Sequence, residues 1–210
     1  AAAGLALVMV LSWPVARSIT RPLSALDKAT QLVGEGQQAR VEVSSDDEIG
    51  RLGESFNVMV AAIEERERQI THVALHDNLT GLPNRKLFAE QIDHAIARRR
   101  GDARLMVVYV DLDDFKVVND TLGHPAGDTL LRNVAAHLQD TLEDAIVARL
   151  GGDEFAILLS EVPPSANLVA LAEKLQGCFD RSITIEGQLA ETSASMGIAI
   201  APDDGTDRVT

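Results

Sequence analysis

Residues 146–160 read IVARLGGDEFAILLS, and this stretch decides how the second half of the chain folds. An apolar run stands on each side of residues 151–154, and a pair of such runs around a short glycine-containing segment is typical of a β-hairpin. Glycine permits a tight turn and the close approach of a ligand to the backbone. The pattern therefore predicts that Asp153 and Glu154 stand at a hairpin tip that a ligand can reach.

A second acidic group follows the most apolar strand of the sequence. Residues 104–112, RLMVVYVDL, are apolar on both faces, as in a central buried strand, and Asp113 and Asp114 follow Asp111 closely. Clustered carboxylates repel one another unless a hard cation neutralises them. If this strand neighbours the hairpin, Asp111 and Asp153 meet at one sheet edge, where Mg²⁺ would complete its shell with phosphate and water. An ordinary Gly-Gly-Asp turn without a ligand is the alternative interpretation.

The remaining pattern after residue 77 alternates between helix and strand. Helices are predicted over 84–100, 126–142 and 165–180, and strands over 104–112, 146–150, 155–159, 182–187 and 191–201. Strands combined with helices on one face of the sheet favour an α+β sandwich.

The composition excludes several classes of protein. The chain has 210 residues, of which 46% are hydrophobic, so it can bury a core and is not disordered throughout. Only 3% are aromatic and the net charge is −13, which together argue against a nucleic-acid partner. The single Cys178 excludes a disulfide framework.

The N-terminal part has a membrane-like beginning. Residues 1–12 carry no charge, and Trp13 and Arg17 follow, which is typical of the inner end of a transmembrane helix. A buried helix of a soluble domain is the alternative. We interpret residues 1–16 as the truncated end of a membrane helix, which would place the residues that follow it on the cytoplasmic side.

Two helical patterns follow this apolar run. The first covers residues 17–35, and the second begins near residue 46. The second carries a seam of residues spaced three and four apart: Phe56, Met59, Ile63, Arg66, Ile70 and Val73. Charged residues cover its other faces, so the seam favours a parallel dimeric coiled coil over packing against the chain's own core.

Residues 13–66 resemble a HAMP linker. The resemblance rests on Arg21-Pro22-Leu23 after the apolar run and on Asp47-Glu48-Ile49-Gly50 at the second helix. In that family two helices per protomer form a parallel four-helix bundle that relays motion from a membrane receptor. The predicted organisation is a membrane segment (1–16), a HAMP linker (17–66), a coiled-coil signalling helix (67–77) and a catalytic domain (78–210).

The catalytic part resembles the GGDEF family of diguanylate cyclases. Four blocks carry the resemblance, in order DNLTGLPNR (77–85), DLDDFKVVND (111–120), LGHPAGD (122–128) and GGDEF (151–155). The resemblance implies a palm-like α+β fold, an antiparallel-rich sheet with flanking helices, preceded by the HAMP helices and a coiled-coil stalk. It also implies that two GTP molecules are condensed to cyclic di-GMP, with release of two pyrophosphates, across a homodimer.

The resemblance assigns roles to individual residues. Asp111 and Asp153 are implied as metal ligands together with the backbone carbonyl of Leu112, and Glu154 as a further catalytic carboxylate that binds metal or activates the 3′-hydroxyl. The implied metal is Mg²⁺, with Mn²⁺ as an alternative. Guanine recognition is implied for Asn119 and Asp128. Contacts to the triphosphate are implied for Phe115, Lys116, Gly151 and Gly152.

Two departures from the family pattern bear on activity. Many members carry an inhibitory RxxD product site whose ends correspond here to Leu142 and Ala145, so we predict no feedback inhibition by cyclic di-GMP through that site. The family's last helix carries phosphate-binding basic residues, and the sequence stops at Thr210 before it, so the fragment alone is predicted to be weakly active or inactive. The alternative function is a catalytically silent GTP-binding module, beside a cyclic di-GMP phosphodiesterase domain in a longer chain.

Overall fold

The computed structural model describes residues 19–42, 47–99, 101, 103–179, 181–185 and 188–207, with the backbone alone for 181–185 and 188–191. The chain divides into two compact units, one up to Thr71 and the other from His72 onward. Among the described residues, no helix is both long and apolar enough to cross a membrane. The predicted membrane segment, 1–16, lies outside the described residues.

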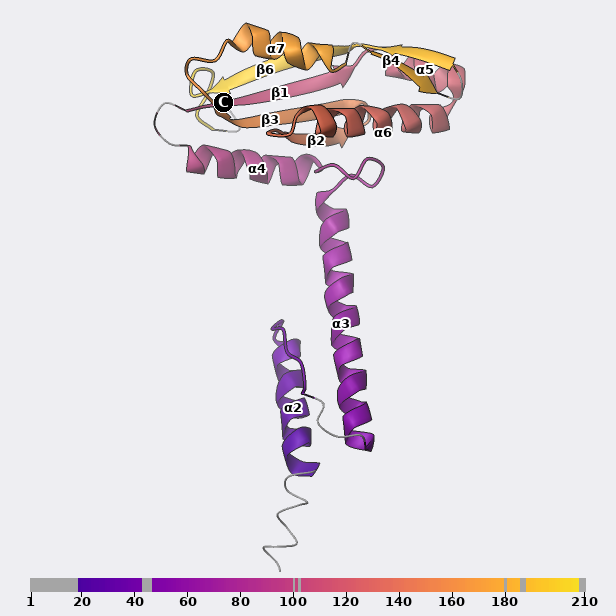
Figure 1. Cartoon of the computed structure of the whole chain (residues 1–210), viewed down its shortest axis with the longest axis vertical. Helices are drawn as coiled ribbons and strands as arrows, with labels where there is room; N and C mark the ends of the chain where they lie inside the picture. Colours follow the sequence, from indigo (N-terminus) through magenta and orange to yellow (C-terminus); the bar gives the residue numbers. More distant parts are fainter. Residues whose placement is uncertain are drawn as a thin grey trace, which may run out of the picture. The chain divides into compact units, whose positions relative to one another are not determined.

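The first unit is built from α2, Arg21–Gly34, and α3, Glu48–Leu75, which continues into the second unit (Figure 1). Asp47 caps the N-terminus of α3, because its side chain accepts hydrogen bonds from the backbone amides of Ile49 and Gly50. Both helices lie where the sequence pattern predicts them. Among the described residues of this unit, the buried hydrophobic side chains form one small cluster, Ala29, Phe56 and Val60.

Asn57 fixes the connector between the two helices. Its side-chain carbonyl accepts from the amide of Val41 at 2.9 Å, and its amide nitrogen donates to the carbonyl of Val41, also at 2.9 Å. The side chain thus pairs with both backbone groups of one residue, as a neighbouring strand would. Val41 is thereby held beside α3 without any strand of its own.

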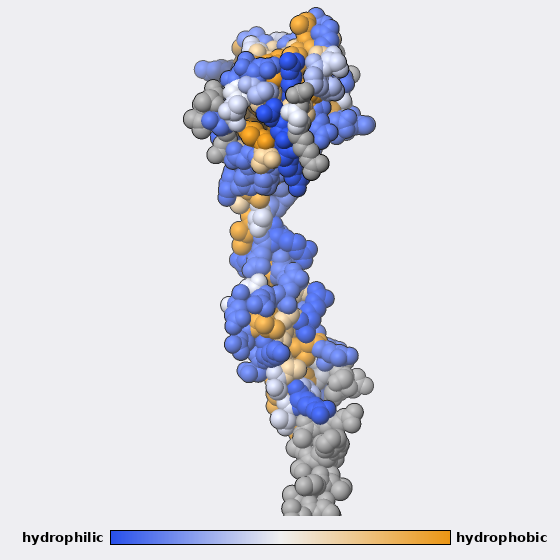
Figure 2. Space-filling view, turned by 90° about the vertical axis from the view of Figure 1, so that its left-hand side faces the viewer, coloured by the Kyte–Doolittle hydropathy of each residue, from blue (hydrophilic) through white to orange (hydrophobic). Residues whose placement is uncertain are grey.

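Most of the predicted seam is exposed in the single chain. Phe56 is buried, but Met59 is 49% exposed, Ile63 41%, Ile70 62% and Val73 56%. Apolar patches accordingly interrupt the hydrophilic surface of α3 in Figure 2. The chain's own core therefore accounts for Phe56 and leaves the rest of the seam uncovered.

The second unit contains a four-stranded antiparallel sheet in the order β2-β3-β1-β6 (Figure 1). Its strands are β1, Arg104–Leu112; β2, Ile146–Gly151; β3, Glu154–Val162; and β6, Ala194–Ala201. A separate two-stranded sheet is formed by β4, Arg181–Ile185, and β5, Gln188–Thr192. The helices of this unit are α4, Arg85–Arg98; α5, Phe115–Leu122; α6, His124–Thr141; and α7, Leu168–Gly177.

Helices pack against both faces of the large sheet. Along β1, Met106, Val108 and Val110 join the main core with residues of α6 and α7, while Leu105 lies on the other face with α4. This alternation follows from the period of two along a strand. The predicted α+β architecture, an antiparallel sheet with flanking helices, is confirmed (Figure 1). The expectation of helices on one face alone was wrong, because the strands bury apolar side chains on both faces and α4 covers the second.

The structure differs from the sequence-based elements at two places. Residues 115–122, which carried no predicted helix, form α5, and the strand predicted over 191–201 is two strands that meet at Ser193. Tertiary hydrogen bonds explain the break: the amide of Asp113 donates to the carbonyl of Ser193, and the side chain of Gln176 donates to the carbonyl of Ala194. Backbone groups at 193–194 therefore bond to other segments at the point where the chain changes sheets.

Candidate active site

The predicted meeting of the two acidic groups is borne out by the strand order. β1 pairs directly with β3, and Asp111 stands opposite Glu154 in the register. A hollow of ≈ 630 Å³ opens where β1 ends and the hairpin turns. It is lined by five of the residues proposed from the sequence: Asp111, Leu112, Phe115, Lys116 and Asp153.

A second hollow of ≈ 250 Å³ adjoins the first. Its lining includes Tyr109, Asp111, Glu154 and Ser195. Asp111 therefore lines both hollows, Asp153 lines the larger and Glu154 lines the smaller. The two consecutive carboxylates of the hairpin, Asp153 and Glu154, thus line different hollows, and Asp111 is common to both.

Negative charge concentrates around Asp111. Partial desolvation raises the pKa of Asp111 above its usual value, and the charges of Asp153, Glu154 and Asp113 raise it further. The side chain of Asp111 is largely exposed, so the neighbouring carboxylates are the more informative cause. Such crowding disfavours the ionised form until a cation is present.

The donor chemistry of the larger hollow fits a hard divalent cation. Asp111 and Asp153 offer carboxylate oxygens beside a space that is wide enough for phosphate. Within the described part of the chain, no three His, Cys, Asp or Glu side chains converge on a metal position. Oxygen donors of this kind suit a hard divalent cation that completes its coordination with water and phosphate oxygens.

The glycines of the hairpin adopt conformations that side chains avoid. Gly151 has φ of 141° and Gly152 has φ of 54°, and both fall where residues with a Cβ are strained. The guanidinium of Arg149 holds the turn by donating to the carbonyl of Gly152 at 3.1 and 2.7 Å. The turn that presents Asp153 and Glu154 is thus fixed by its own preceding strand.

The same arginine connects the hairpin to the loop that follows α3. Its Nη1 donates to both carboxylate oxygens of Asp77, at 2.9 and 3.0 Å. Asp77 also accepts from the amide and hydroxyl of Thr80. Burial alone would raise the pKa of Asp77, but the bonds from Thr80 and Arg149 outweigh it and hold that pKa below its ordinary value.

Helices α5 and α6 carry the two predicted guanine-binding residues. Asn119 lies on α5, and Asp128 lies in the first turns of α6. Gly127 precedes Asp128, and a Cβ at this position would overlap the Oδ1 atom of Asn119 and approach Phe115 Cζ to 3.2 Å. Only glycine lets the two helices approach so closely, so Gly127 sets the position of Asn119.

Four residues of this region were missed by the sequence-based reasoning. They are Asp77, Arg85, Gly127 and Arg149, and each stands in or next to a motif block that was recognised. Their contacts join segments far apart in sequence: Arg149 with Asp77 and Arg85 with Glu154. The available signal was a charged residue or a glycine in or beside a recognised block, with no role assigned to it.

An α+β domain whose acidic strand end faces a glycine-shaped acidic hairpin offers the oxygen donors that a nucleotide-binding enzyme acting through a divalent cation needs. The family model described as "Diguanylate cyclase, GGDEF domain" matches residues 74–210, and the HAMP domain model matches residues 15–65. The chain therefore belongs to the GGDEF family of diguanylate cyclases and carries a HAMP domain.

Curated relatives agree with this assignment. The chain is 35% identical over 206 residues to the diguanylate cyclase TpbB of Pseudomonas aeruginosa, covering 92% of this chain and 47% of the relative. It is 41% identical over 160 residues to MucR of the same species, a bifunctional diguanylate cyclase/cyclic di-GMP phosphodiesterase, covering 75% of this chain and 23% of MucR. The chain thus spans about half of TpbB or less than a quarter of MucR.

Solved structures show the same fold. The GGDEF domain of TpbB superposes with a TM-score of 0.57 at 39% identity, covering 62% of this chain and 79% of that chain. The coiled coil and GGDEF domain of DgcB from Caulobacter crescentus, in complex with c-di-GMP, gives a TM-score of 0.61 at 28% identity, covering 74% of this chain and 84% of that chain.

Proposed function

We propose that the protein condenses two GTP molecules into cyclic di-GMP and releases two pyrophosphates. The observation that carries this proposal is the shared hollow, where Asp111 from β1 and Asp153 from the hairpin stand beside Phe115 and Lys116 at the start of α5. Carboxylates that attract a cation, next to a lysine and a helix N-terminus that attract phosphate, suit a nucleoside triphosphate with its metal.

The metal side of the site would be formed by Asp111, Asp153 and the carbonyl of Leu112, with Mg²⁺ as the ion and Mn²⁺ as a substitute. A bound divalent cation neutralises triphosphate charge and polarises the phosphorus that is attacked. Lys116 would hold the outer phosphates by its ammonium group. The backbone of Phe115, Gly151 and Gly152 would follow the phosphates at close range, because glycine offers no side chain there.

The base would lie at the junction of α5 and α6. Asp128 would accept hydrogen bonds from the N1 and 2-amino groups of guanine, and Asn119 would pair with its other polar groups. Adenine lacks that pair of donors, so binding it would leave a carboxylate unmatched, and such a loss discriminates strongly between substrates. The close contact of Gly127 with the side chain of Asn119 supports this arrangement, since Gly127 is the residue next to Asp128.

The reaction requires a second active site. One domain would hold one GTP, and the 3′-hydroxyl of a GTP on a second copy would attack from the side opposite pyrophosphate. Glu154 lines the smaller hollow next to Asp111, where it could orient or deprotonate that hydroxyl. Two domains must then face each other about a two-fold axis, and orientation alone contributes several kcal/mol to catalysis.

The N-terminal helices would control that geometry. We assign residues 17–66 to the HAMP linker, 67–77 to a coiled-coil signalling helix and 78–210 to the catalytic domain, with residues 1–16 as the end of a membrane helix. Exposed Met59, Ile63, Ile70 and Val73 support pairing of α3 with a second copy. A receptor at the bacterial inner membrane would then switch the cytoplasmic catalytic domains by moving these helices.

The test is direct detection of product. Residues 1–210, and a version extended beyond Thr210, are incubated with GTP and Mg²⁺, and cyclic di-GMP and pyrophosphate are quantified by mass spectrometry and a coupled assay. We expect product from the extended chain, little from residues 1–210 alone, and none when ATP replaces GTP. Absence of product from an extended, folded and dimeric chain would contradict the proposal.

A silent GTP-binding module is the second candidate. It is favoured by the likeness to the cyclic di-GMP phosphodiesterase PdeR of Escherichia coli, which is 43% identical over 147 residues, covering 69% of this chain and 22% of the relative, because that name carries a phosphodiesterase activity and no cyclase activity. Titration of the extended chain with GTP by calorimetry separates the two candidates. Measurable GTP binding without product would favour the module.

A further inference from the structure

Glu154 is held by a residue from another element. Nη2 of Arg85, the first residue of α4, lies 2.8 Å from Oε2 of Glu154, although the two residues are 69 positions apart in sequence. Glu154 also stands opposite Asp111 in the strand register, on the same face of the sheet. Without the guanidinium of Arg85 beside it, the Glu154 carboxylate would be free to turn toward Asp111 and Asp153.

Arg85 is in turn fixed to the end of α3. The preceding residue, Asn84, caps α4 by accepting hydrogen bonds from amides of its first turn. The amide group of the Asn84 side chain donates to the carbonyl of Ala74 at 2.9 Å, and its backbone amide donates to the carbonyl of Leu75 at 2.9 Å. The start of α4, and therefore the base of the Arg85 side chain, moves with the last turn of α3.

We propose that Arg85 is a positioning residue that keeps the Glu154 carboxylate at the smaller hollow and away from the metal-binding pair Asp111 and Asp153. The division of the hairpin carboxylates supports this: Asp153 lines the larger hollow and Glu154 the smaller. Arg85 leaves Asp111 and Asp153 to the metal and makes Glu154 available to the attacking nucleotide. The inference deepens the proposed cyclase function and rests on it.

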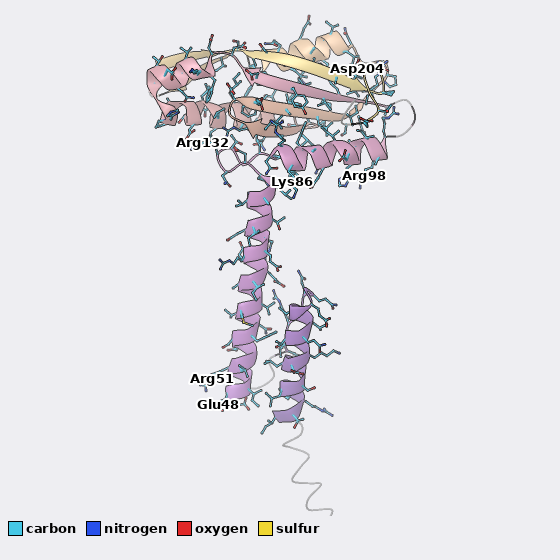
Figure 3. All side chains as sticks on the ribbon, turned by 180° about the vertical axis from the view of Figure 1, so that it is seen from behind. Glu48, Arg51, Lys86, Arg98, Arg132 and Asp204 are labelled. Carbon is cyan, nitrogen blue, oxygen red and sulfur yellow. The ribbon has the colours of Figure 1, made fainter. Side chains whose placement is uncertain are left out.

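The ion pair between Arg85 and Glu154 contributes little to the stability of the fold. The side chains of Arg85 and Glu154 are 63% and 48% exposed, and pairs this exposed contribute little to folding. Substitutions at Arg85 should therefore leave the fold intact and act on the site. Lys86 provides a matched control, because it is the next residue, carries the same charge and is also exposed (Figure 3 labels it near the start of α4).

The first experiment compares Arg85→Gln, Arg85→Lys and Lys86→Gln in the extended chain. We expect Arg85→Gln to lower kcat about tenfold while KM for GTP stays within about twofold, because orientation of a reacting group is lost and ground-state binding is not. Arg85→Lys should recover most of kcat, and Lys86→Gln should match the unaltered protein. Equal kcat for Arg85→Gln and Lys86→Gln would overturn the proposal.

The second experiment needs no turnover. Binding of Mn²⁺ is followed by electron paramagnetic resonance in the presence of a non-hydrolysable GTP analogue. Arg85→Gln should tighten Mn²⁺ binding about three- to fivefold, since a released Glu154 adds negative charge beside Asp111 and Asp153. Lys86→Gln should change the affinity for Mn²⁺ less than Arg85→Gln does.

The double variant isolates the contact. In a Glu154→Gln background the carboxylate is gone, so Arg85→Gln should change Mn²⁺ binding no more than Lys86→Gln does. A full shift in that background would show that Arg85 acts through its charge alone and would overturn the proposal. This cycle remains informative if the protein binds GTP without converting it, so failure of the proposed function and failure of this inference are distinguishable.

Discussion

The two units of the chain bury their apolar residues to very different extents. The first unit buries Ala29, Phe56 and Val60 and leaves Ile70 and most of its seam exposed. The second unit buries a large core that includes Phe155 and residues from both sides of the sheet. The second unit can therefore hold its shape in a single chain, whereas we expect the first to depend on a second copy.

The difference bears on control as well as on stability. If the first unit pairs with a second copy as proposed, its helices could move the second unit as a rigid object, because that unit holds its own shape. If the two units are independent in this way, substitutions in the active site, the core and the helices should each have separate effects.

The largest effect is expected at the active site without any effect on the core. Asp153→Asn should lower cyclic di-GMP synthesis by roughly 10²- to 10³-fold, since a negatively charged oxygen that organises the transition state is lost. The melting temperature of the second unit should not change. Activity is measured as product by mass spectrometry, with the exposed Asp140→Asn as control. Retained turnover would remove Asp153 from the metal site.

The next prediction compares a core residue of each unit. Phe155 is fully buried, so Phe155→Ala should cost about 3–5 kcal/mol of unfolding free energy, independently of protein concentration. Phe56 is 6% exposed in a small cluster, and the transition that Phe56→Ala affects should shift upward with protein concentration, because pairing with a second copy stabilises it. Urea unfolding at several concentrations measures both. Two unfolding transitions that do not depend on protein concentration would contradict the expectation that the first unit needs a second copy.

A smaller effect is expected from the contact between α5 and α6. Gly127→Ala would force Asn119 away from its position, so KM for GTP should rise about tenfold. Gly177→Ala is the control, since a Cβ there meets no atom within 4 Å, and alanine favours a helix. Steady-state kinetics measure KM for GTP in both variants. Equal KM values would remove Gly127 and Asn119 from guanine binding.

The smallest effect concerns the link between Asp77 and Arg149. The pKa of Asp77 is lowered in the folded state, so its stabilisation is complete above the unfolded value of about 3.9 and is lost as the pH falls through the folded value. Asp77→Asn should therefore cost about 1–2 kcal/mol at pH 7 and progressively less below pH ~4. Urea unfolding between pH 7 and pH 3 measures this. A cost that does not vary with pH would contradict the lowered pKa.

The elements that the sequence predicted well have strong internal patterns. The apolar run within 104–112 and the glycine hairpin at 151–154 define β1, β2 and β3. Asn84 and Asn167 cap helices near their predicted starts. Asp111 and Asp153 were expected to meet because each follows or divides such a run. Local periodicity and turn chemistry were sufficient for these features.

The features that were missed depend on contacts between distant segments. Residues 115–122 form α5 after Asp114, which adopts a left-handed conformation with φ of 55° that no local pattern signals. The break at Ser193 arises from bonds to Asp113 and its surroundings. Arg85 finds Glu154 across 69 positions, and only the folded topology brings them together.

The double attachment of Arg149 has a consequence for local opening. One guanidinium bonds to Asp77 in the loop after α3 and to the carbonyl of Gly152 in the hairpin, and its backbone amide donates to the carbonyl of Pro83. Neither segment can leave its place without releasing the other, so both should open together as one cooperative unit. In hydrogen–deuterium exchange, the amides of Thr80 and Arg149 should then share one protection factor, and in Arg149→Lys they should exchange at separate rates.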